Sequence, residues 1–361
     1  MTETKARVFP RQMPAGHEPV VQRYSARLPE GTRAVHVLCL GYQAAGTDRD
    51  GAKQFLTEAS QLFATASGPV HHDFSSFVDP EGYATVLAVA YWLEPEVHDA
   101  WRSSEVVSGW WSNPSRDAGP GGYFLESMSV SVDHLETIAF KEYVRGLSAC
   151  PANTISAILE SGYWGAARDR IPASAFDALG SAHTAPLAFD LAVESTGRRV
   201  TVIPPANMVA IRSGVSWADC GAEQLASYEK NVKPKLDRGM EYLRTHPADS
   251  GCFSLRQVDV IDPDGTPRKE GYSLGYFLSL GHLETWSRSH PTHLAIYARA
   301  MAERKKYREK LELRTYHEVY VVDGDVRFEY VNCHPRTGLL PFRFSSPAAA
   351  CPATGATRAP R

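Results

Sequence analysis

The chain has 361 residues, of which 43% are hydrophobic and 22% charged, and its formal net charge is −3 at pH 7. This composition is typical of a folded globular protein and excludes a disordered or collagen-like chain, while the length predicts about two packed units. The small negative charge argues against a nucleic-acid partner, because phosphate binding usually needs an excess of lysine and arginine on one face.

Residues 1–33 are rich in proline, arginine and polar residues, and we expect an irregular arm there. Glu3, Pro10 and Pro14 interrupt the apolar stretch that a signal peptide would need, and the chain contains no apolar run long enough for a transmembrane helix. A cytoplasmic protein without a membrane partner is therefore predicted. Residues 345–361 are small and proline-rich, which indicates a disordered tail.

Residues 34–150 are expected to form a first ferredoxin-like unit. Apolar periodicity and the content of β-branched and aromatic residues predict strands at 34–43, 71–79 and 83–92. Helices are predicted at 50–66 and 94–111, and the second of them begins at the Glu94-Pro95 pair.

Residues 151–344 are expected to form a second unit with the same order of elements. Strands are predicted at 207–217, 253–262 and 271–282, and helices at 218–246, on either side of Pro234, and at 283–313. A short echo links the halves, since Glu-Gly-Tyr precedes a tryptophan-containing helix in both, at Glu81 and at Glu270. The repeated order predicts an α+β fold of tandem ferredoxin-like units with a cavity between sheet and helices.

His293 lies in the segment SHPTHL, where Pro291 is suited to the first position of a helix. Tyr297 and Met301 follow at steps of four, so an apolar helix face directs the imidazole inward. Such a histidine can serve as an axial ligand to iron, with its other ring nitrogen bonded to a nearby carbonyl. The alternative is a buried histidine that only donates to the backbone.

Three further segments carry residues that suit either a site or ordinary structure. In the predicted strand around YHEV, His317 and Val319 share one face while Glu318 and Tyr320 take the other. In AIRSG, Arg212 and Ser213 point to opposite faces near a strand end. GYWGAARDR places two arginines after two aromatic residues, where a guanidinium could line a pocket or join a solvated surface patch.

Together, five segments resemble the haem-containing aldoxime dehydratase family: GYWGAARDR, AIRSG, SHPTHL, YHEV and VNCHPRTG, in this order between about residue 34 and about residue 340. The resemblance implies a lyase that dehydrates aldoximes to nitriles, with a dimeric α+β barrel fold and usually a homodimer. It also implies non-covalent b-type haem, ferrous in the active form. The six cysteines form no CxxCH motif for covalent attachment.

The resemblance places the proximal haem-iron ligand on His293, the second histidine of SHPTHL, rather than on His290. It implies a catalytic set of His317, Ser213, Arg170 and Glu136. Arg168 stays an alternative to Arg170, because the spacing to Ser213 differs slightly from the family pattern. The chain departs from the family pattern in two places. Ser161 stands where some relatives carry a histidine. The charged stretch AERKKYREK makes the separation between His293 and His317 a few residues longer, and we expect it on a polar helix face.

The mechanism implied has the oxime nitrogen bound directly to ferrous haem. His317 acts as general acid and base, while Ser213 and Arg170 orient the leaving hydroxyl. A peroxidase-like haem enzyme, a haem-binding sensor and a cofactor-free module with an apolar ligand are the competing interpretations. The sequence does not distinguish alkyl from aryl aldoximes.

Overall fold

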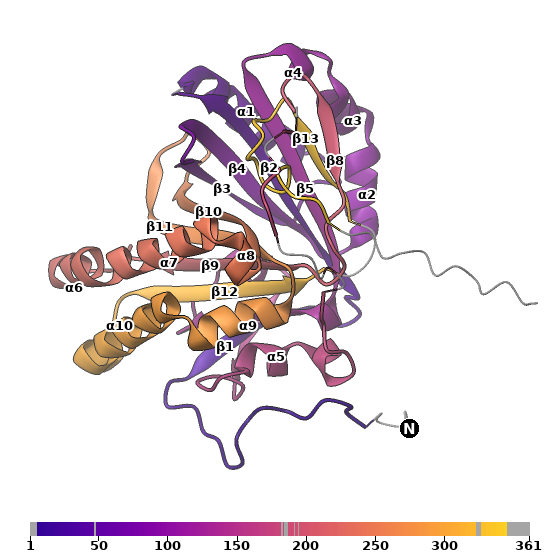
Figure 1. The fold of residues 1–361 in the computed structure, drawn as a ribbon. Coiled ribbons are helices and arrows are strands. Elements are labelled where there is room, and N and C mark those ends of the chain that lie inside the picture. The colour runs from indigo at the N-terminus through magenta and orange to yellow at the C-terminus, as the bar shows by residue number, and fades with distance from the viewer. Residues whose placement is uncertain are drawn as a thin grey trace, which may run out of the picture.

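The computed structural model describes residues 6–46, 48–181, 183, 187–190, 192–193, 195–322 and 326–344. The tail predicted at 345–361 lies outside these residues. Figure 1 shows two groups of strands that run in different directions, each with helices of its own. Among the described residues, no helix is long and apolar enough to cross a membrane.

The first unit has its strands in the order β3-β4-β2-β5, which is the ferredoxin-like arrangement. The elements are β2 (Ala34–Ala45), α1 (Arg49–Phe63), β3 (His71–Val78), β4 (Tyr83–Trp92), α2 (Pro95–Ser103), α3 (Glu105–Ser112), α4 (Ser115–Ala118) and β5 (Gly121–Ser131). The single helix predicted at 94–111 is divided, because the Ser104 hydroxyl accepts from Val107 N and caps a new helix.

The second unit repeats this arrangement with the order β12-β9-β11-β10. Its elements are β9 (Val209–Ser216), α6 (Ala222–Ser227), a π-helical turn (Tyr228–Val232), α7 (Lys233–Thr245), α8 (Pro247–Ser250), β10 (Cys252–Ile261), β11 (Pro267–Phe277), α9 (Leu280–Ser289), α10 (Pro291–Tyr307) and β12 (Arg314–Val321). The π-helical turn precedes Pro234, which has no N–H for the helix ladder and whose ring crowds the preceding turn.

One 13-stranded sheet contains both units, because β10 pairs with β3 and Val260 lies opposite Ser75. Strands β6 (Leu135–Phe140), β1 (Arg23–Arg27) and β7 (Thr154–Ile158) continue the sheet beyond β12. On the other side, β13 (Phe328–Val331) and β8 (Arg199–Val202) continue it beyond β5. The predicted tandem ferredoxin-like fold is therefore confirmed.

The remaining described helices are short: the 3-10 turns Val132–His134, Gly146–Ala149, Pro172–Ala175 and Arg308–Lys310, and α5 (Ala166–Arg170). The expected boundaries at 33, 150 and 344 stay a prediction. Strand β1 lies within the segment predicted as an arm, and β6 from the first predicted unit pairs with β12 of the second.

The two faces of the second unit's sheet have different roles. On one face, Arg212 Nη2 donates to Asp73 Oδ1 at 2.7 Å, and Arg212 Nη1 donates to the Tyr91 hydroxyl at 2.7 Å. These buried contacts join β9 to β3 and β4 of the first unit. On the opposite face, Val319 packs with α7 and α9 in an apolar cluster. His317 lies on this second face, beneath the helices.

Candidate functional site

A cavity of about 680 Å³ lies between the sheet and the helices of the second unit, within the usual size range of cofactor and ligand sites. His317 and Ile138 line it from the sheet, and His293 from the opposite side. The other walls come from the N-terminal segment, the GYWG loop with α5, and helices α9 and α10: Gln12, His17, Val20, Val21, Arg23, Ser161, Gly162, Tyr163, Trp164, Gly165, Ala166, Ala167, Arg170, Gly281, Glu284, Thr285, Ser287, Arg288, Tyr297, Met301 and Arg304. The predicted position of a cavity between sheet and helices is confirmed.

His293 stands in the first turn of α10, as Pro291 predicted, and His290 caps the helix by accepting from Thr292 N. The His293 ring contacts Trp286 at 4.8 Å between ring centroids. No described group meets hydrogen-bond geometry with the buried Nδ1. Burial lowers the pKa of His293, and the nearby Ser287 carbonyl counters part of that effect. A neutral imidazole facing a largely apolar cavity is the form that ligates iron, so the residue fits an axial ligand.

His317, Glu136 and Arg170 form a hydrogen-bonded cluster on the sheet side of the cavity. His317 Nε2 lies 2.9 Å from Glu136 Oε1, and Arg170 Nε donates to Glu136 Oε2 at 2.8 Å. Arg170 Nη2 lies 3.3 Å from His317 Nε2. Burial opposes ionisation of Glu136, but Arg170 and then His317 outweigh it and lower its pKa to about 2. Glu136 is therefore an anion at neutral pH, and it can orient the imidazole.

The local structure of α5 explains why Arg170 reaches this cluster and Arg168 does not. Gly165 enters the helix with a positive φ of 93°, and successive residues then project in different directions. Arg168 turns to α9, where its Nη2 donates to Glu284 Oε2 at 2.7 Å. Asp169 accepts from the backbone N–H groups of Gln12 and Met13, which holds the N-terminal segment over the cavity.

Ser213 lies directly opposite His317 in the β9–β12 register, so both side chains leave the same face of the sheet. Its side chain is exposed, and it is not part of the lining of the cavity. The structure thus places Ser213 beside the cluster rather than in it. As predicted, Arg212 takes the opposite face.

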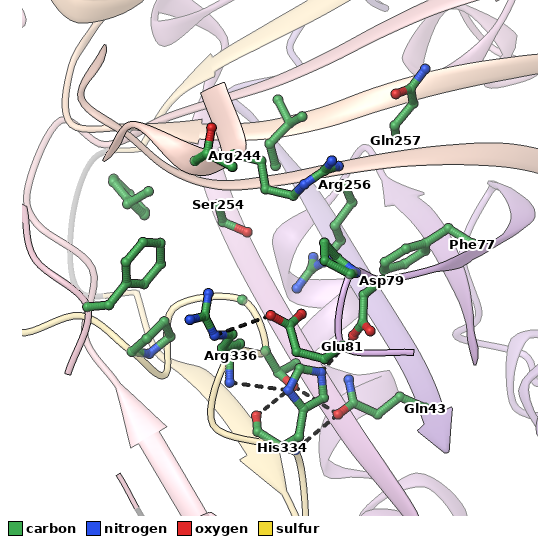
Figure 2. A pocket seen from close by; sticks show the side chains of 18 of the residues that line it. Gln43, Phe77, Asp79, Glu81, Arg244, Ser254, Arg256, Gln257, His334 and Arg336 are labelled. Atoms are coloured by element: carbon green, nitrogen blue, oxygen red, sulfur yellow. Dashed lines mark hydrogen bonds and ion pairs between the residues drawn. The ribbon is translucent and has the colours of Figure 1, made fainter. Parts of the chain in front are cut away.

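Residues of the VNCHPRTG segment line part of a second cavity, of about 290 Å³ (Figure 2). His334 Nε2 lies 2.7 Å from Asp79 Oδ2, and Arg336 Nε donates to Glu81 Oε1 at 3.2 Å. His334 N donates to the side-chain oxygen of Gln43. These contacts fasten the segment after β13 to the β3–β4 turn, which gives the motif a structural role.

Three arginines that line the first cavity, Arg23, Arg288 and Arg304, were not predicted. Arg304 belongs to the stretch AERKKYREK, expected on a polar helix face, yet it lines the cavity, and its neighbour Glu303 is buried. A sequence signal existed, because Arg304 follows His293 by eleven residues and so returns to the same helix face. Arg23 also lines the cavity from β1, where no sequence signal indicated a strand.

Comparisons with known proteins agree over most of the chain. Residues 39–339 match the model of the haem-containing dehydratase family. An aliphatic aldoxime dehydratase from Pseudomonas chlororaphis is 36% identical over 340 residues, which cover 92% of this chain and 94% of the relative. A phenylacetaldoxime dehydratase from Bacillus sp. (strain OxB-1) is 35% identical over 335 residues, which cover 92% of this chain and 94% of the relative.

Two crystal structures resemble the whole fold. One, of an aldoxime dehydratase, matches with a TM-score of 0.85 and 34% identity, covering 95% of this chain and 97% of that one. The other, of an aldoxime dehydratase in complex with butyraldoxime, matches with the same TM-score of 0.85 and 34% identity, covering 93% of each chain.

Proposed function

Because the chain belongs to the family of haem-containing dehydratases, we propose that it dehydrates aldoximes to nitriles, with one haem bound between His293 and His317. The observation that carries the proposal is that two different histidines face one cavity. His293 has a buried Nδ1 that meets hydrogen-bond geometry with no described group, whereas His317 is tied to an anionic carboxylate. One histidine thus suits metal ligation, and the other suits proton transfer.

The cavity suits a non-covalent b-type haem. His293 would be the proximal ligand, and Trp286 and Trp164 flank its ring at 4.8 and 6.3 Å between ring centroids. No cysteine lies among the described residues that line the cavity, which is consistent with non-covalent binding. Ferrous haem held by His293 would supply an iron centre with a coordination position open to the oxime nitrogen.

His317 carries the proton chemistry in this proposal. Its Nε2–H is donated to Glu136, so Nδ1 is the ring nitrogen that exchanges a proton with the substrate. The imidazolium gives a proton to the leaving hydroxyl, which departs as water. Neutral His317 then takes the proton from the oxime carbon, leaving the nitrile and restoring the imidazolium.

Glu136 and Arg170 hold His317 in position, and Arg170 is fixed in turn by donating from Nη1 to the Glu160 carbonyl at 2.5 Å. The Nη2 group of Arg170, next to His317, is the donor placed to orient the substrate hydroxyl. Ser213 is the second proposed donor, since its strand position adjoins His317. We therefore propose the same catalytic set as the sequence predicts: His317, Ser213, Arg170 and Glu136.

The apolar part of the lining favours an aldoxime with an apolar substituent, because Val21, Ile138, Trp164 and Met301 line the space. A homodimer and a cytoplasmic location belong to the same proposal.

The deciding experiment is an anaerobic assay of haem-loaded, dithionite-reduced protein with butyraldoxime and with phenylacetaldoxime. Nitrile is followed by chromatography beside the Soret spectrum, for the wild type and for His293→Ala. Nitrile from the wild type, with haem and activity both lost in the variant, supports the proposal. A normal Soret band without nitrile from either substrate refutes the dehydratase activity and favours a peroxidase-like enzyme or a haem sensor.

A further inference from the structure

Two arginines from distant parts of the chain converge on one aromatic ring at the edge of the first cavity. The guanidinium carbon of Arg23, on β1, lies 4.9 Å from the centroid of the Phe140 ring. The guanidinium carbon of Arg304, on α10, lies 5.1 Å from the same centroid. Arg23 and Phe140 are direct partners in the β1–β6 register, and both arginines line the cavity.

Neither guanidinium has an anionic partner within the described part of the chain. The ion pairs found there include Arg170 with Glu136, Arg168 with Glu284 and Arg336 with Glu81, but none involves Arg23 or Arg304. Burial alone lowers the pKa of Arg304 to about 10, so the group remains a cation at neutral pH. Two partly buried cations that lie close together without a counter-charge raise the free energy of the folded state. A ligand that brings carboxylates would remove that cost.

The position of Arg304 relative to His293 suits a flat ligand centred on the imidazole. Eleven residues separate them on α10, which is about three turns and about 16 Å along the helix axis, on nearly the same face. Helical side chains lean toward the N-terminus, so the guanidinium extends back toward His293. A flat ligand centred on His293 would therefore present its edge to Arg304.

We propose that Arg23 and Arg304 form a dicarboxylate site that binds the two propionates of the haem. The inference rests on the proposed function, because it takes haem to be the occupant of the cavity. The arginine pair would turn the propionate edge toward Phe140 and thereby set the in-plane orientation of the ring above His293. A substrate carboxylate has the same chemistry as a propionate, and the experiment separates the two sources.

The test is a Soret titration of the haem-free protein with iron protoporphyrin IX and with its dimethyl ester, which lacks free carboxylates. We compare the wild type with Arg23→Gln, Arg304→Gln and the double variant. Arg27→Gln, on the same strand and exposed, and Lys305→Gln, exposed on the same helix, remove one cation each as matched controls. Arg304→Lys keeps the charge, and melting temperatures of the haem-free proteins report folding.

Each Arg→Gln change should weaken diacid binding about tenfold and leave ester binding unchanged, since a charge-assisted hydrogen bond is lost. The double variant should bind the diacid and the ester equally well. The affinity of Arg304→Lys for the diacid should lie between those of the wild type and Arg304→Gln, and the controls should match the wild type. Equal losses for diacid and ester would overturn the proposal and leave a packing role. Unchanged diacid affinity in correctly folded variants would also overturn it.

A final arm measures KM for a carboxylate-bearing aldoxime and for butyraldoxime. If the variants raise KM for the former alone, with haem affinity unchanged, the pair binds a substrate carboxylate and the haem assignment is wrong. A wild type that prefers the diacid but forms no nitrile supports this inference while refuting the proposed dehydratase activity, so the two failures are distinguishable.

Discussion

Glu136 on β6 and His317 on β12 share a 2.9 Å hydrogen bond although 181 residues separate them along the chain. The contact exists because β6, which follows the first unit, leaves it and pairs with the last strand of the second unit. The proposed proton-transfer residue therefore depends on a carboxylate contributed from the other half of the sequence.

His317→Ala should lower the turnover number about 10²- to 10⁴-fold, because the proposed general acid and base is removed. The Soret band of the reduced protein should persist, since His293 is untouched. Single-turnover nitrile formation beside the absorption spectrum measures both. The exposed His246, replaced by alanine, is the control. Full turnover in His317→Ala would rule out its role.

Glu136→Gln should lower the free energy of unfolding by about 3 kcal/mol, because it leaves the buried Arg170 without its anionic partner. Urea unfolding of the haem-free protein measures the change. Glu284→Gln, which breaks the more exposed pair with Arg168, should cost less. Equal costs for the two variants would contradict the importance of burial at Glu136.

Stability should fall as pH drops below about 6.5, because of a buried pair of histidines in the first unit. The rings of His36 and His98 stack at 3.3 Å between centroids. Burial, and then His98, lower the pKa of His36 to about 2, and burial lowers that of His98. Above pH 6.5 both rings are neutral whether the chain is folded or unfolded, so their stabilising packing is fully retained. Below it, the unfolded chain gains protons that the folded chain does not.

For His36 alone, this linkage should remove about 2 kcal/mol between pH 6.5 and pH 5. Urea unfolding at half-unit steps of pH measures the slope for the wild type and for His36→Gln. The variant should show a flatter dependence. An identical slope in both proteins would show that His36 does not carry the effect.

Asp169→Asn should loosen the N-terminal segment over the cavity. Its carboxylate accepts from Gln12 N, Met13 N and the Tyr163 hydroxyl, and the amide retains fewer of these acceptor sites and no charge. We expect cleavage by trypsin after Arg11 to accelerate several-fold, and haem to dissociate faster into an apomyoglobin acceptor. Unchanged rates of both processes would show that the segment is held by other contacts.

Much of the fold could be predicted from local pattern. Alternation and helical periodicity gave β2, β4 and α1, and the Pro291 rule gave the start of α10. Pairing between distant edges, such as β10 with β3, leaves no such local signal, because it depends on which edges remain unpaired after each unit folds.

The site was predicted less completely, for the same reason. Arg168 and Arg170 are two residues apart on one helical turn, and only their tertiary partners, Glu284 and Glu136, decide which of them faces His317. The polarity of AERKKYREK suggested a solvated surface, whereas Arg304 faces the cavity. A charged residue in a helix is informative about a site only once the opposite wall is known.

The ladder between β10 and β3 has a further consequence for how the two units stay together. Since one polypeptide carries both edges, their encounter is intramolecular, and its effective concentration is set by the connecting chain rather than by the amount of protein in solution. Dilution therefore does not separate the units, and this ladder adds no concentration dependence to the melting temperature.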